Sequence, residues 1–472
     1  MNNNARKIWI ALIASVLGLA VLSTLFLTEQ RPPDIVVIVM DTTRRDHLSC
    51  YGYESNTTPT LDELADESTV FARAYSTSGW TNSAHASLFT GLFPSAHQTT
   101  QRRWSMTEEH TTLAEVLSDH GYTTFAAVEN PMLARRHRFD QGFDTYIETW
   151  KGPTNTAQSH SVLTQWRQFL NARDSKKPFF AFFNLITPHS PYDSLPVRDN
   201  PFITDPSIRC DDNRWRDFYL GRASFSPAEY QHLRERYDGE LLVTDLVIGR
   251  IIAELKSRNA WDNTLLVVTA DHGENIGDHD MVDHVFSLHE TLTQIPLIIR
   301  YPLRFGANTV DERRVQLTDL FPTILDCAGI DPGKYASQGR NLLDETLSSE
   351  DGVVICEYDY PLQAINAFAP QDRDNPALEP YRRDLKSVTM NGCKLIWASD
   401  GKHELYDLER DPNETKNLID SEAFHEIRLS LARRLERAVA QSIQMRAAGS
   451  ATPTETLDED TREALKALGY LD

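Results

Sequence analysis

Two stretches of sequence decide the fold: Asp34-Ile-Val-Val-Ile-Val-Met40 and Thr264-Leu-Leu-Val-Val-Thr-Ala270. Continuous apolar runs of this kind, rich in β-branched residues, are typical of strands buried on both faces of a parallel sheet. Each run is followed at once by side chains that can bind metals, Asp41 after the first and Asp271-His272 after the second. Since parallel strands bring their carboxyl ends to one edge of the sheet, these side chains are expected at a common site.

The rest of the first 345 residues continues this pattern. Two more apolar runs, at residues 178–186 and 296–300, predict further strands. Helical patterns lie between the runs, at residues 60–67, 112–121 and 228–258. Alternating strands and helices predict a doubly wound α/β domain over residues 34–345, with a mostly parallel sheet.

The pattern changes after about residue 345. Short apolar runs predict four antiparallel strands, at residues 353–357, 386–389, 394–397 and 403–406. Asn391-Gly392 and Asp400-Gly401 are hairpin turn signals between them. A helical pattern over residues 422–446 and a C-terminal tail follow. We therefore predict a small α+β domain over residues 346–472, closed by a docking tail.

Composition narrows the class of protein. The 472 residues include 47 Lys and Arg against 68 Asp and Glu, a formal charge of −21. An acidic surface repels phosphate backbones, so we predict no nucleic-acid partner. The five cysteines are odd in number and widely spaced, which argues against a disulfide framework or a structural zinc site. The pattern still allows one disulfide between two distant cysteines.

The N-terminus carries a candidate membrane segment. Residues 8–27 are almost wholly apolar, which as a helix gives about 30 Å, enough to cross a bilayer. Arg6 and Lys7 precede this segment, so the positive-inside rule places the N-terminus in the cytoplasm. We predict an uncleaved signal anchor followed by a linker to residue 33, with the remainder of the chain periplasmic or extracellular. The alternative is a cleaved signal and a secreted protein.

A third segment, Gly79 to Gly91, carries a candidate nucleophile. It places Thr81 and His85 at the start of an apolar helical stretch. A helix N-terminus favours anions, and a hydroxyl there acts as a nucleophile when a metal lowers its pKa. The alternatives are that Thr81 is a simple N-cap, that Asp271 caps a turn and that His272 is incidental.

These pieces belong to a longer series of ordered motifs. The series includes Asp41-Thr-Thr-Arg-Arg-Asp-His-Leu-Ser-Cys-Tyr-Gly52, Thr57-Thr-Pro-Thr-Leu-Asp62, Phe71-Ala-Arg-Ala-Tyr75, His85-Ala-Ser-Leu-Phe-Thr-Gly91, Phe139-Asp-Gln-Gly-Phe-Asp144, Pro188-His-Ser-Pro-Tyr192, Ala270-Asp-His-Gly-Glu274, Asp319-Leu-Phe-Pro-Thr323 and Glu404-Leu-Tyr-Asp-Leu-Glu-Arg-Asp-Pro-Asn-Glu414. In this order the motifs resemble the sulfatase family of the alkaline phosphatase superfamily. The resemblance covers nearly everything after residue 34 and implies an alkaline-phosphatase-like fold.

The resemblance also shows where this chain departs from the family. Its sulfatases convert a cysteine or serine to formylglycine within a Cys/Ser-x-Pro-x-Arg signature. Here the matching residues are Thr81, Ser83 and His85, so formylglycine is not expected. Thr42 stands at the second aspartate of the family's metal pair.

The remaining quartet of Asp41, Thr81, Asp271 and His272 is similar to the one-metal sites of phosphoethanolamine and glycerophosphate transferases. Threonine is the nucleophile in those enzymes. The resemblance therefore implies one divalent ion, Ca, Mn, Zn or Mg, bound by this quartet. It also implies a threonine nucleophile here.

The resemblance also implies a role for two further histidines. His189 matches a substrate-facing histidine of the family, and His284 falls near a lysine that contacts the transferred group. Either would protonate a leaving oxygen near neutral pH. His85, in place of an arginine, would orient Thr81. The alternative is that His189 and His284 are structural or lie in a polar surface loop.

Two functions from different classes follow. The first is a sulfatase-family hydrolase or transferase that acts on phosphate or sulfate esters through Thr81. Its substrate would be a small anionic ester, a glycan or a lipid head group. The second is a non-catalytic protein of the same fold that binds an anionic glycan or lipid head group. It is suggested by the changes at Thr42 and His85, and by Glu129 in a segment that lacks the lysine and histidine of the family.

Overall fold

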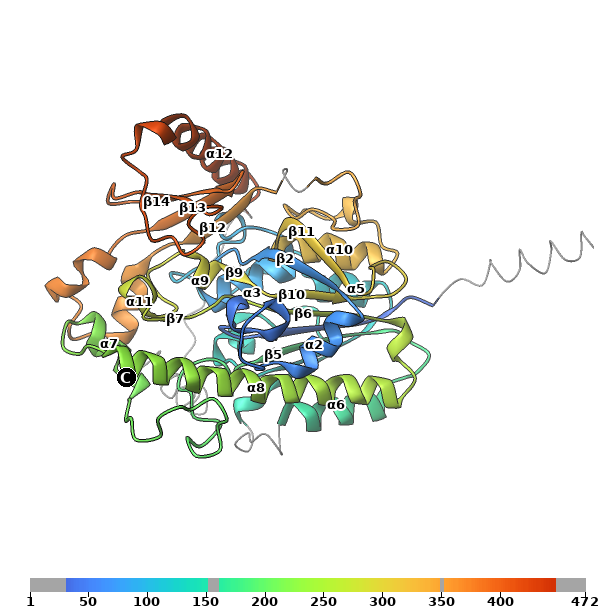
Figure 1. Cartoon of the computed structure of the whole chain (residues 1–472). Coiled ribbons are helices and arrows are strands. Elements are labelled where there is room, and N and C mark those ends of the chain that lie inside the picture. Colours follow the sequence, from blue (N-terminus) through green and yellow to red (C-terminus); the bar gives the residue numbers. More distant parts are fainter. Residues whose placement is uncertain (1–30, 152–160, 349–351, 447–472) are drawn as a thin grey trace, which may run out of the picture. The chain divides into compact units, whose positions relative to one another are not determined.

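The computed structural model describes residues 31–151, 161–348 and 352–446 (Figure 1). The described residues from Pro33 onward form one compact unit. In the described part of the chain, no helix is both long and apolar enough to span a bilayer. The predicted anchor at residues 8–27 and the tail after residue 446 lie outside the described residues. The domain boundary at residue 345 and the anchor therefore stay predictions.

A mixed, mostly parallel sheet forms the centre of this unit. Within the described residues its strands are β1 (Asp34–Met40), β2 (Thr69–Tyr75), β3 (Thr123–Val128), β4 (Thr145–Glu148), β5 (Phe179–Leu185), β6 (Thr264–Ala270), β9 (Gln294–Ile295), β10 (Leu297–Arg300) and β11 (Thr309–Gln316). Their order is β11-β2-β10-β6-β1-β5-β3-β4, and β9 pairs with β2. At the centre, Met40 of β1 lies opposite Leu185 of β5 and Ala270 of β6, both in parallel register. The predicted α/β class is confirmed.

Strand β10 departs from the parallel arrangement expected of its apolar run. It pairs antiparallel with both β6 and β2. Its side chains are nonetheless buried on both faces, with Ile298 on one side of the sheet and Leu297 and Ile299 on the other. Burial on both faces makes such a run apolar whichever way the strand points.

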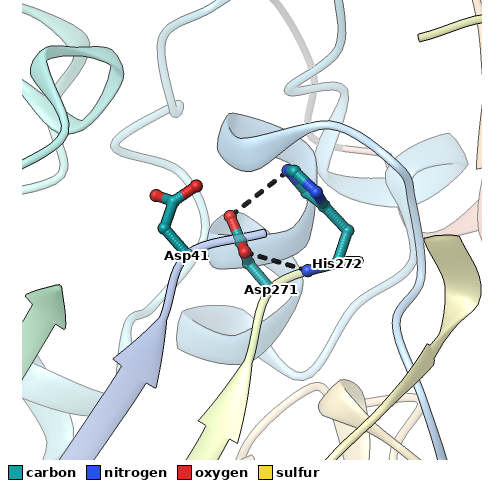
Figure 2. Close-up of side chains that lie close together, drawn as sticks. All are labelled: Asp41, Asp271 and His272. Carbon is teal, nitrogen blue, oxygen red and sulfur yellow. Dashed lines mark hydrogen bonds and ion pairs between the residues drawn. The ribbon is translucent and has the colours of Figure 1, made fainter. Parts of the chain in front are cut away.

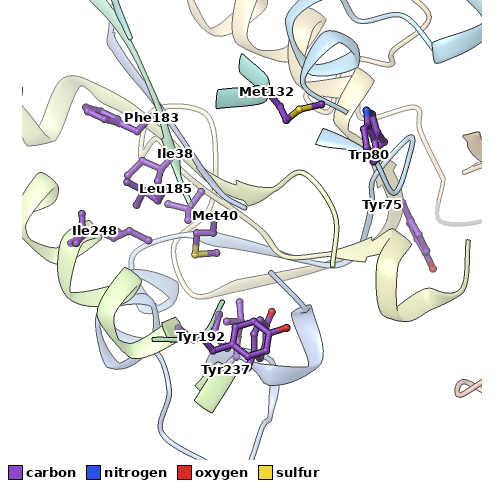
Figure 3. Packing of buried hydrophobic residues seen from close by; sticks show 14 of the residues in the cluster. Ile38, Met40, Tyr75, Trp80, Met132, Phe183, Leu185, Tyr192, Tyr237 and Ile248 are labelled. Carbon is purple, nitrogen blue, oxygen red and sulfur yellow. The ribbon is translucent and has the colours of Figure 1, made fainter. Parts of the chain in front are cut away.

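Helices cover both faces of the central sheet. On the face of Ile38 and Met40 the packed helices are α2 (Pro59–Asp66), α6 (Ser161–Ala172) and α8 (Pro227–Ser257). Figure 3 shows this packing, with Ile248 of α8 beside Ile38 and Leu185. The opposite face packs against α3 (Thr81–Thr90), α5 (Leu113–Asp119) and α10 (Leu320–Cys327). The sheet is therefore buried between two helical layers, as its β-branched strands require.

A small antiparallel sheet follows the central one. It contains β12 (Val354–Tyr358), β13 (Leu385–Met390), β14 (Cys393–Ala398) and β15 (Glu404–Asp407), in that order. Asn391 and Gly392 both have positive φ, as the tight hairpin between β13 and β14 requires. Helix α12 (His425–Gln444) packs Leu431 and Leu435 on this sheet. The predicted strands and helix are thus present.

Shorter elements complete the described chain. They are α4 (Pro94–His97), α7 (Trp215–Tyr219), α9 (Glu290–Thr293), α11 (Pro361–Phe368), β7 (Asn275–Ile276) and β8 (Val282–Asp283). All five cysteines lie in the described residues and are free thiols, so the disulfide left open by the sequence is not formed.

Candidate active site

Two carboxylates and an imidazole meet at the carboxyl edge of the central sheet (Figure 2). Asp41 follows β1, and Asp271 and His272 follow the neighbouring strand β6. All three are at most 1% exposed, and each offers a ligand atom within 4.8 Å of the others. The side chains expected from the two decisive runs are therefore brought together.

In each carboxylate, one oxygen accepts hydrogen bonds and the other accepts none from the described residues. Asp271 Oδ1 accepts the backbone N–H of Thr42 at 3.1 Å and of His272 at 2.9 Å. Asp41 Oδ2 accepts from two side-chain amides. Asp41 Oδ1 and Asp271 Oδ2 are buried and have no hydrogen-bond partner among the described residues. Buried carboxylate oxygens without donors are costly, so a cation between them would be strongly favoured.

Electrostatics point the same way. Burial, and next the nearby carboxylate of Asp41, raise the pKa of Asp271 well above its usual range. Burial, followed by His284, lowers the pKa of His272. A bound divalent cation would offset the repulsion between the carboxylates and favour a neutral imidazole ligand.

His272 is held in the form that a metal ligand needs. Its Nδ1 lies 3.0 Å from the carbonyl oxygen of Gly273, so this nitrogen carries the hydrogen and donates. The lone pair of Nε2 then faces the site, 3.3 Å from Thr81 Oγ1 and 3.4 Å from Asp271 Oδ2. A fixed tautomer of this kind is typical of metal-binding histidines. The residues fit one divalent ion with Asp41, Asp271 and His272 as ligands and Thr81 beside them.

Thr81 is the first residue of α3, not its cap. The N-cap position belongs to Trp80, which makes no side-chain cap bond. The Thr81 hydroxyl therefore has its hydrogen bond with His272 and lies at the positive end of the helix dipole. The alternative that Thr81 is a simple N-cap is wrong.

His85 lies one helical turn after Thr81 and supports it. Its Nδ1 is 2.8 Å from the Thr81 carbonyl oxygen and 3.7 Å from Asp271 Oδ2. Burial lowers the pKa of His85. A neutral His85 that donates to the Thr81 carbonyl fixes the first turn of α3, which fits the expected orienting role.

His189 and His284 form a pair beside this group. Their Nε2 atoms are 3.1 Å apart, and the ring of His284 lies 4.6 Å from that of His272. Both are buried, at 3% and 1% exposure. At this distance one of the two nitrogens carries a hydrogen and donates it to the other, so the two rings are hydrogen-bonded next to the site. Neither residue lies in a surface loop open to solvent.

Two buried asparagines were missed by sequence reasoning. The amides of Asn130 and Asn184 each donate to Asp41 Oδ2 at 2.9 Å. Asn184 is the one amide in the apolar run of β5, and Asn130 follows β3. A lone amide in a strand that is otherwise apolar was the available signal, because a buried amide needs a polar partner.

Arg44 and Arg45, from the motif after β1, and two histidines of the segment after β6 make other contacts. Arg44 is ion-paired with Asp46 at 2.7 Å and with Asp278 at 2.6 Å, which braces the loop after β1. Arg45 donates to the carbonyl of Ala72. The ring of His279 stacks on that of His289, with 3.7 Å between centroids. Arg44, Arg45, His279 and His289 line a cleft to which Thr81 does not contribute.

Comparisons with known proteins identify the family. The family model described as Sulfatase matches residues 33–330. The chain belongs to the sulfatase family. It is an ester hydrolase of the alkaline phosphatase superfamily, as the motifs predicted.

Individual relatives are distant but cover most of the chain. An arylsulfatase from Clostridium perfringens is 24% identical, over 84% of this chain and 92% of its own length. An N-acetylglucosamine-6-O-sulfatase from Bacteroides thetaiotaomicron is 22% identical, over 88% and 87%. The solved structure of a phosphonate monoester hydrolase from Agrobacterium radiobacter has a TM-score of 0.69 and 22% identity, covering 87% of this chain and 96% of that one. The likeness in structure shows the shared alkaline-phosphatase-like fold.

Proposed function

We propose that this sulfatase-family protein is a metal-dependent hydrolase or transferase of phosphate or sulfate esters, with Thr81 as the nucleophile. One observation carries the proposal. The Thr81 hydroxyl lies 3.3 Å from His272 Nε2, in a buried group whose Asp41 and Asp271 each keep one oxygen without a donor. A hydroxyl beside a set of cation ligands is the arrangement that activates an alcohol as a nucleophile.

The chemistry follows from the placement of these residues. A divalent cation held by Asp41, Asp271 and His272 would favour the deprotonated Thr81 hydroxyl and stabilise charge on the transferred group. Thr81 Oγ1 forms a bond to the phosphorus or sulfur atom while the bond to the ester oxygen breaks. When one imidazole of the His189–His284 pair is protonated, it gives that proton to the departing oxygen and becomes a neutral imidazole. Water or an acceptor hydroxyl then releases the group from Thr81.

The chemical nature of Thr81 bears on the substrate. The sulfatases that this chain resembles depend on an aldehyde hydrate, which threonine cannot form. A plain alcohol suits phosphoryl transfer better, and the similar fold of a phosphonate monoester hydrolase supports a phosphorus substrate. The relative that acts on N-acetylglucosamine 6-O-sulfate supports a sugar as the leaving group. We infer an anionic ester of a glycan or a lipid head group.

The test is kinetic and has a matched control in the same helix. Thr81→Ala should lower turnover of nitrophenyl phosphate, phosphodiester or sulfate by at least about a thousandfold, because it deletes the nucleophile. Thr81→Ser keeps the hydroxyl and should keep part of the activity. Thr90→Ala removes the same atoms at the other end of α3, where the hydroxyl donates to the Ala86 carbonyl and accepts from the Leu92 N–H. It should leave turnover near that of the parent.

Equal turnover by Thr81→Ala and Thr90→Ala would remove Thr81 from the reaction. Comparing the three substrates in the parent protein decides between phosphorus and sulfur. A preference for the sulfate ester would contradict the phosphorus assignment while leaving the nucleophile intact.

We also propose that the enzyme is anchored in the membrane by residues 8–27 and faces the periplasm or the extracellular space. The proposal rests on the apolar length of this segment and on Arg6 and Lys7 before it. Mass analysis of the mature N-terminus should find the segment retained. A start between residues 25 and 35 would instead mean a cleaved signal and a secreted enzyme.

A further inference from the structure

We propose a second anion-binding site, built around Arg314 at the edge of the central sheet. A cleft of about 570 Å³ lies between strands β2 and β11 on one side and the small C-terminal sheet on the other. Its walls include Arg45, Arg73 and Arg314, together with Leu408 and Pro412. None of the metal-site residues lines this cleft. The proposal is thus independent of the function assigned to Thr81.

Arg314 is buried, yet no acidic side chain is paired with its guanidinium. The residue is 6% exposed, and within the described part of the chain its guanidinium makes no hydrogen bond and no ion pair. Only its backbone carbonyl is used, as an acceptor for Arg340. Arginines this little exposed are normally paired, and the unpaired nitrogens of Arg314 reach the open space of the cleft, since none of them is a fully buried atom. The five donors of Arg314 are therefore available to a ligand in the cleft.

Its neighbours add positive charge at the same place. Arg73 lies directly opposite Arg314 in the parallel register of β2 and β11. Arg45 donates through Nη1 to the Ala72 carbonyl, but its buried Nε has no partner among the described residues. Like charges on neighbouring strands destabilise a sheet unless an anion lies between them.

The glutamates of the cleft do not neutralise Arg314. Glu290 is ion-paired with Lys394 at 2.8 Å. Glu312 lies 3.5 Å from Arg73, and both of these side chains are well exposed, so the pair is weak. Glu409 is exposed at the rim. The charge that remains deep in the cleft is the guanidinium of Arg314.

The planar set of N–H donors on the Arg314 guanidinium determines which ligands the site can bind. A guanidinium binds oxyanions in bidentate fashion, so the site fits a sulfate, phosphate or carboxylate group. The volume of the cleft exceeds that of one such ion. The group is therefore either a free anion or the charged substituent of a larger molecule such as a sugar, and the experiment separates these sources.

Calorimetric titration of the whole protein tests the site. Sodium sulfate, sodium phosphate and a sulfated disaccharide are titrated at constant ionic strength into the parent, Arg314→Met and Arg304→Met. Arg304 is a matched control, because it is partly exposed and paired with Asp326 away from the cleft. Arg314→Met should weaken one binding event by about tenfold or more, the worth of a charged hydrogen bond. Arg304→Met should bind like the parent.

Asp271→Asn distinguishes anion binding at Arg314 from binding at the metal site. This variant should lose turnover but keep the anion binding that depends on Arg314. Arg314→Met should keep turnover. Tighter binding of the disaccharide than of sulfate assigns the anion to a glycan, and equal binding assigns it to the free ion. If Arg314→Met fails to fold, Arg314→Lys and Arg73→Gln carry the test, and each should weaken the same event. Unchanged binding in the Arg314 variants, or loss of every binding event in Asp271→Asn, would overturn the proposal.

Discussion

At the scale of single residues, two amides determine which oxygen of Asp41 faces a cation. Asn130 and Asn184 both donate to Oδ2, and Oδ1 is left without a hydrogen-bond partner among the described residues. The amides hold the carboxylate in one orientation, so no rotation is required when a cation binds. Partners that orient a ligand in this way are worth about 10- to 100-fold in metal affinity.

Asn184→Leu should therefore weaken metal binding by about 10- to 100-fold. The leucine has a similar shape but donates no hydrogen bond, so Asp41 Oδ2 is held by the Asn130 amide alone. Titration with a competing chelator measures the affinity, and circular dichroism checks that the fold is kept. An unchanged affinity in a folded Asn184→Leu protein would mean that Asp41 needs no such support.

The sequence identified Asp41, Thr81, Asp271 and His272 as a group because each follows a strand or begins a helix. Chain direction alone predicts that such positions meet at one edge of the sheet. It could not identify Asn130 and Asn184, because their role depends on side-chain contacts across three strands. The pairing of His189 with His284, 95 residues apart, is likewise a product of packing.

At the scale of elements, the turn after β6 depends on a glycine. A Cβ atom at Gly273 would lie 2.0 Å from the carbonyl oxygen of Thr291 in α9. That carbonyl belongs to the backbone and cannot move away without shifting α9. The chain thus approaches closely here, and His272 is placed by this contact.

Gly273→Ala should displace His272, lower metal affinity and lower the thermal midpoint by several degrees, about 1–3 kcal/mol of overpacking. Gly333→Ala is the control, since a Cβ there meets only the side chain of Asp331 at 3.2 Å. The control should bind metal like the parent. Normal metal content in Gly273→Ala would show that the turn tolerates a side chain.

Strand β10 shows what an element's sequence does not reveal. Its apolar run was expected in a parallel sheet, and it is buried on both faces as predicted. Its antiparallel direction follows from the short path that returns the chain to the sheet after α9, not from its composition. The hairpin at Asn391-Gly392, by contrast, was predictable, since the backbone conformation of the turn selects those residues.

At the scale of the whole molecule, the C-terminal sheet is joined to the segment that carries the nucleophile. The backbone N–H of Glu357 in β12 donates to the Thr77 carbonyl at 2.8 Å. Ser78 Oγ donates back to the Glu357 carbonyl at 2.7 Å. The residues leading into α3 are thus fixed from both sides, by the central sheet and by β12. This sheet is therefore part of the support of Thr81.

Stability of the whole unit should depend on the pH through Glu240 of α8. Its Oε1 accepts the Ser194 N–H, and burial raises the pKa of Glu240 to about 8 from 4.5. The folded protein thus keeps a proton that the unfolded chain releases. This proton contributes fully to the free energy of unfolding below pH 4.5. The contribution is lost as the pH rises toward about 8, by about 1.4 kcal/mol per pH unit.

Glu240→Gln replaces the protonated acid by a neutral amide and should remove this loss. The variant should gain stability relative to the parent as the pH rises from about 5 to about 8. Urea unfolding at both ends of this range measures the gain. The exposed Glu426→Gln serves as the control, and an identical pH dependence in all three proteins would refute the assignment.

The central claim is that Thr81 becomes covalently bound to the group it transfers. It is tested most directly by mixing the metal-loaded enzyme with substrate, quenching in acid within a turnover and mapping the digest by mass spectrometry. The account predicts one phosphoryl or sulfuryl group on the peptide containing Thr81, and none on that peptide from Thr81→Ala. Steady turnover with no adduct on Thr81, or with the adduct on His189 or His284, would contradict it.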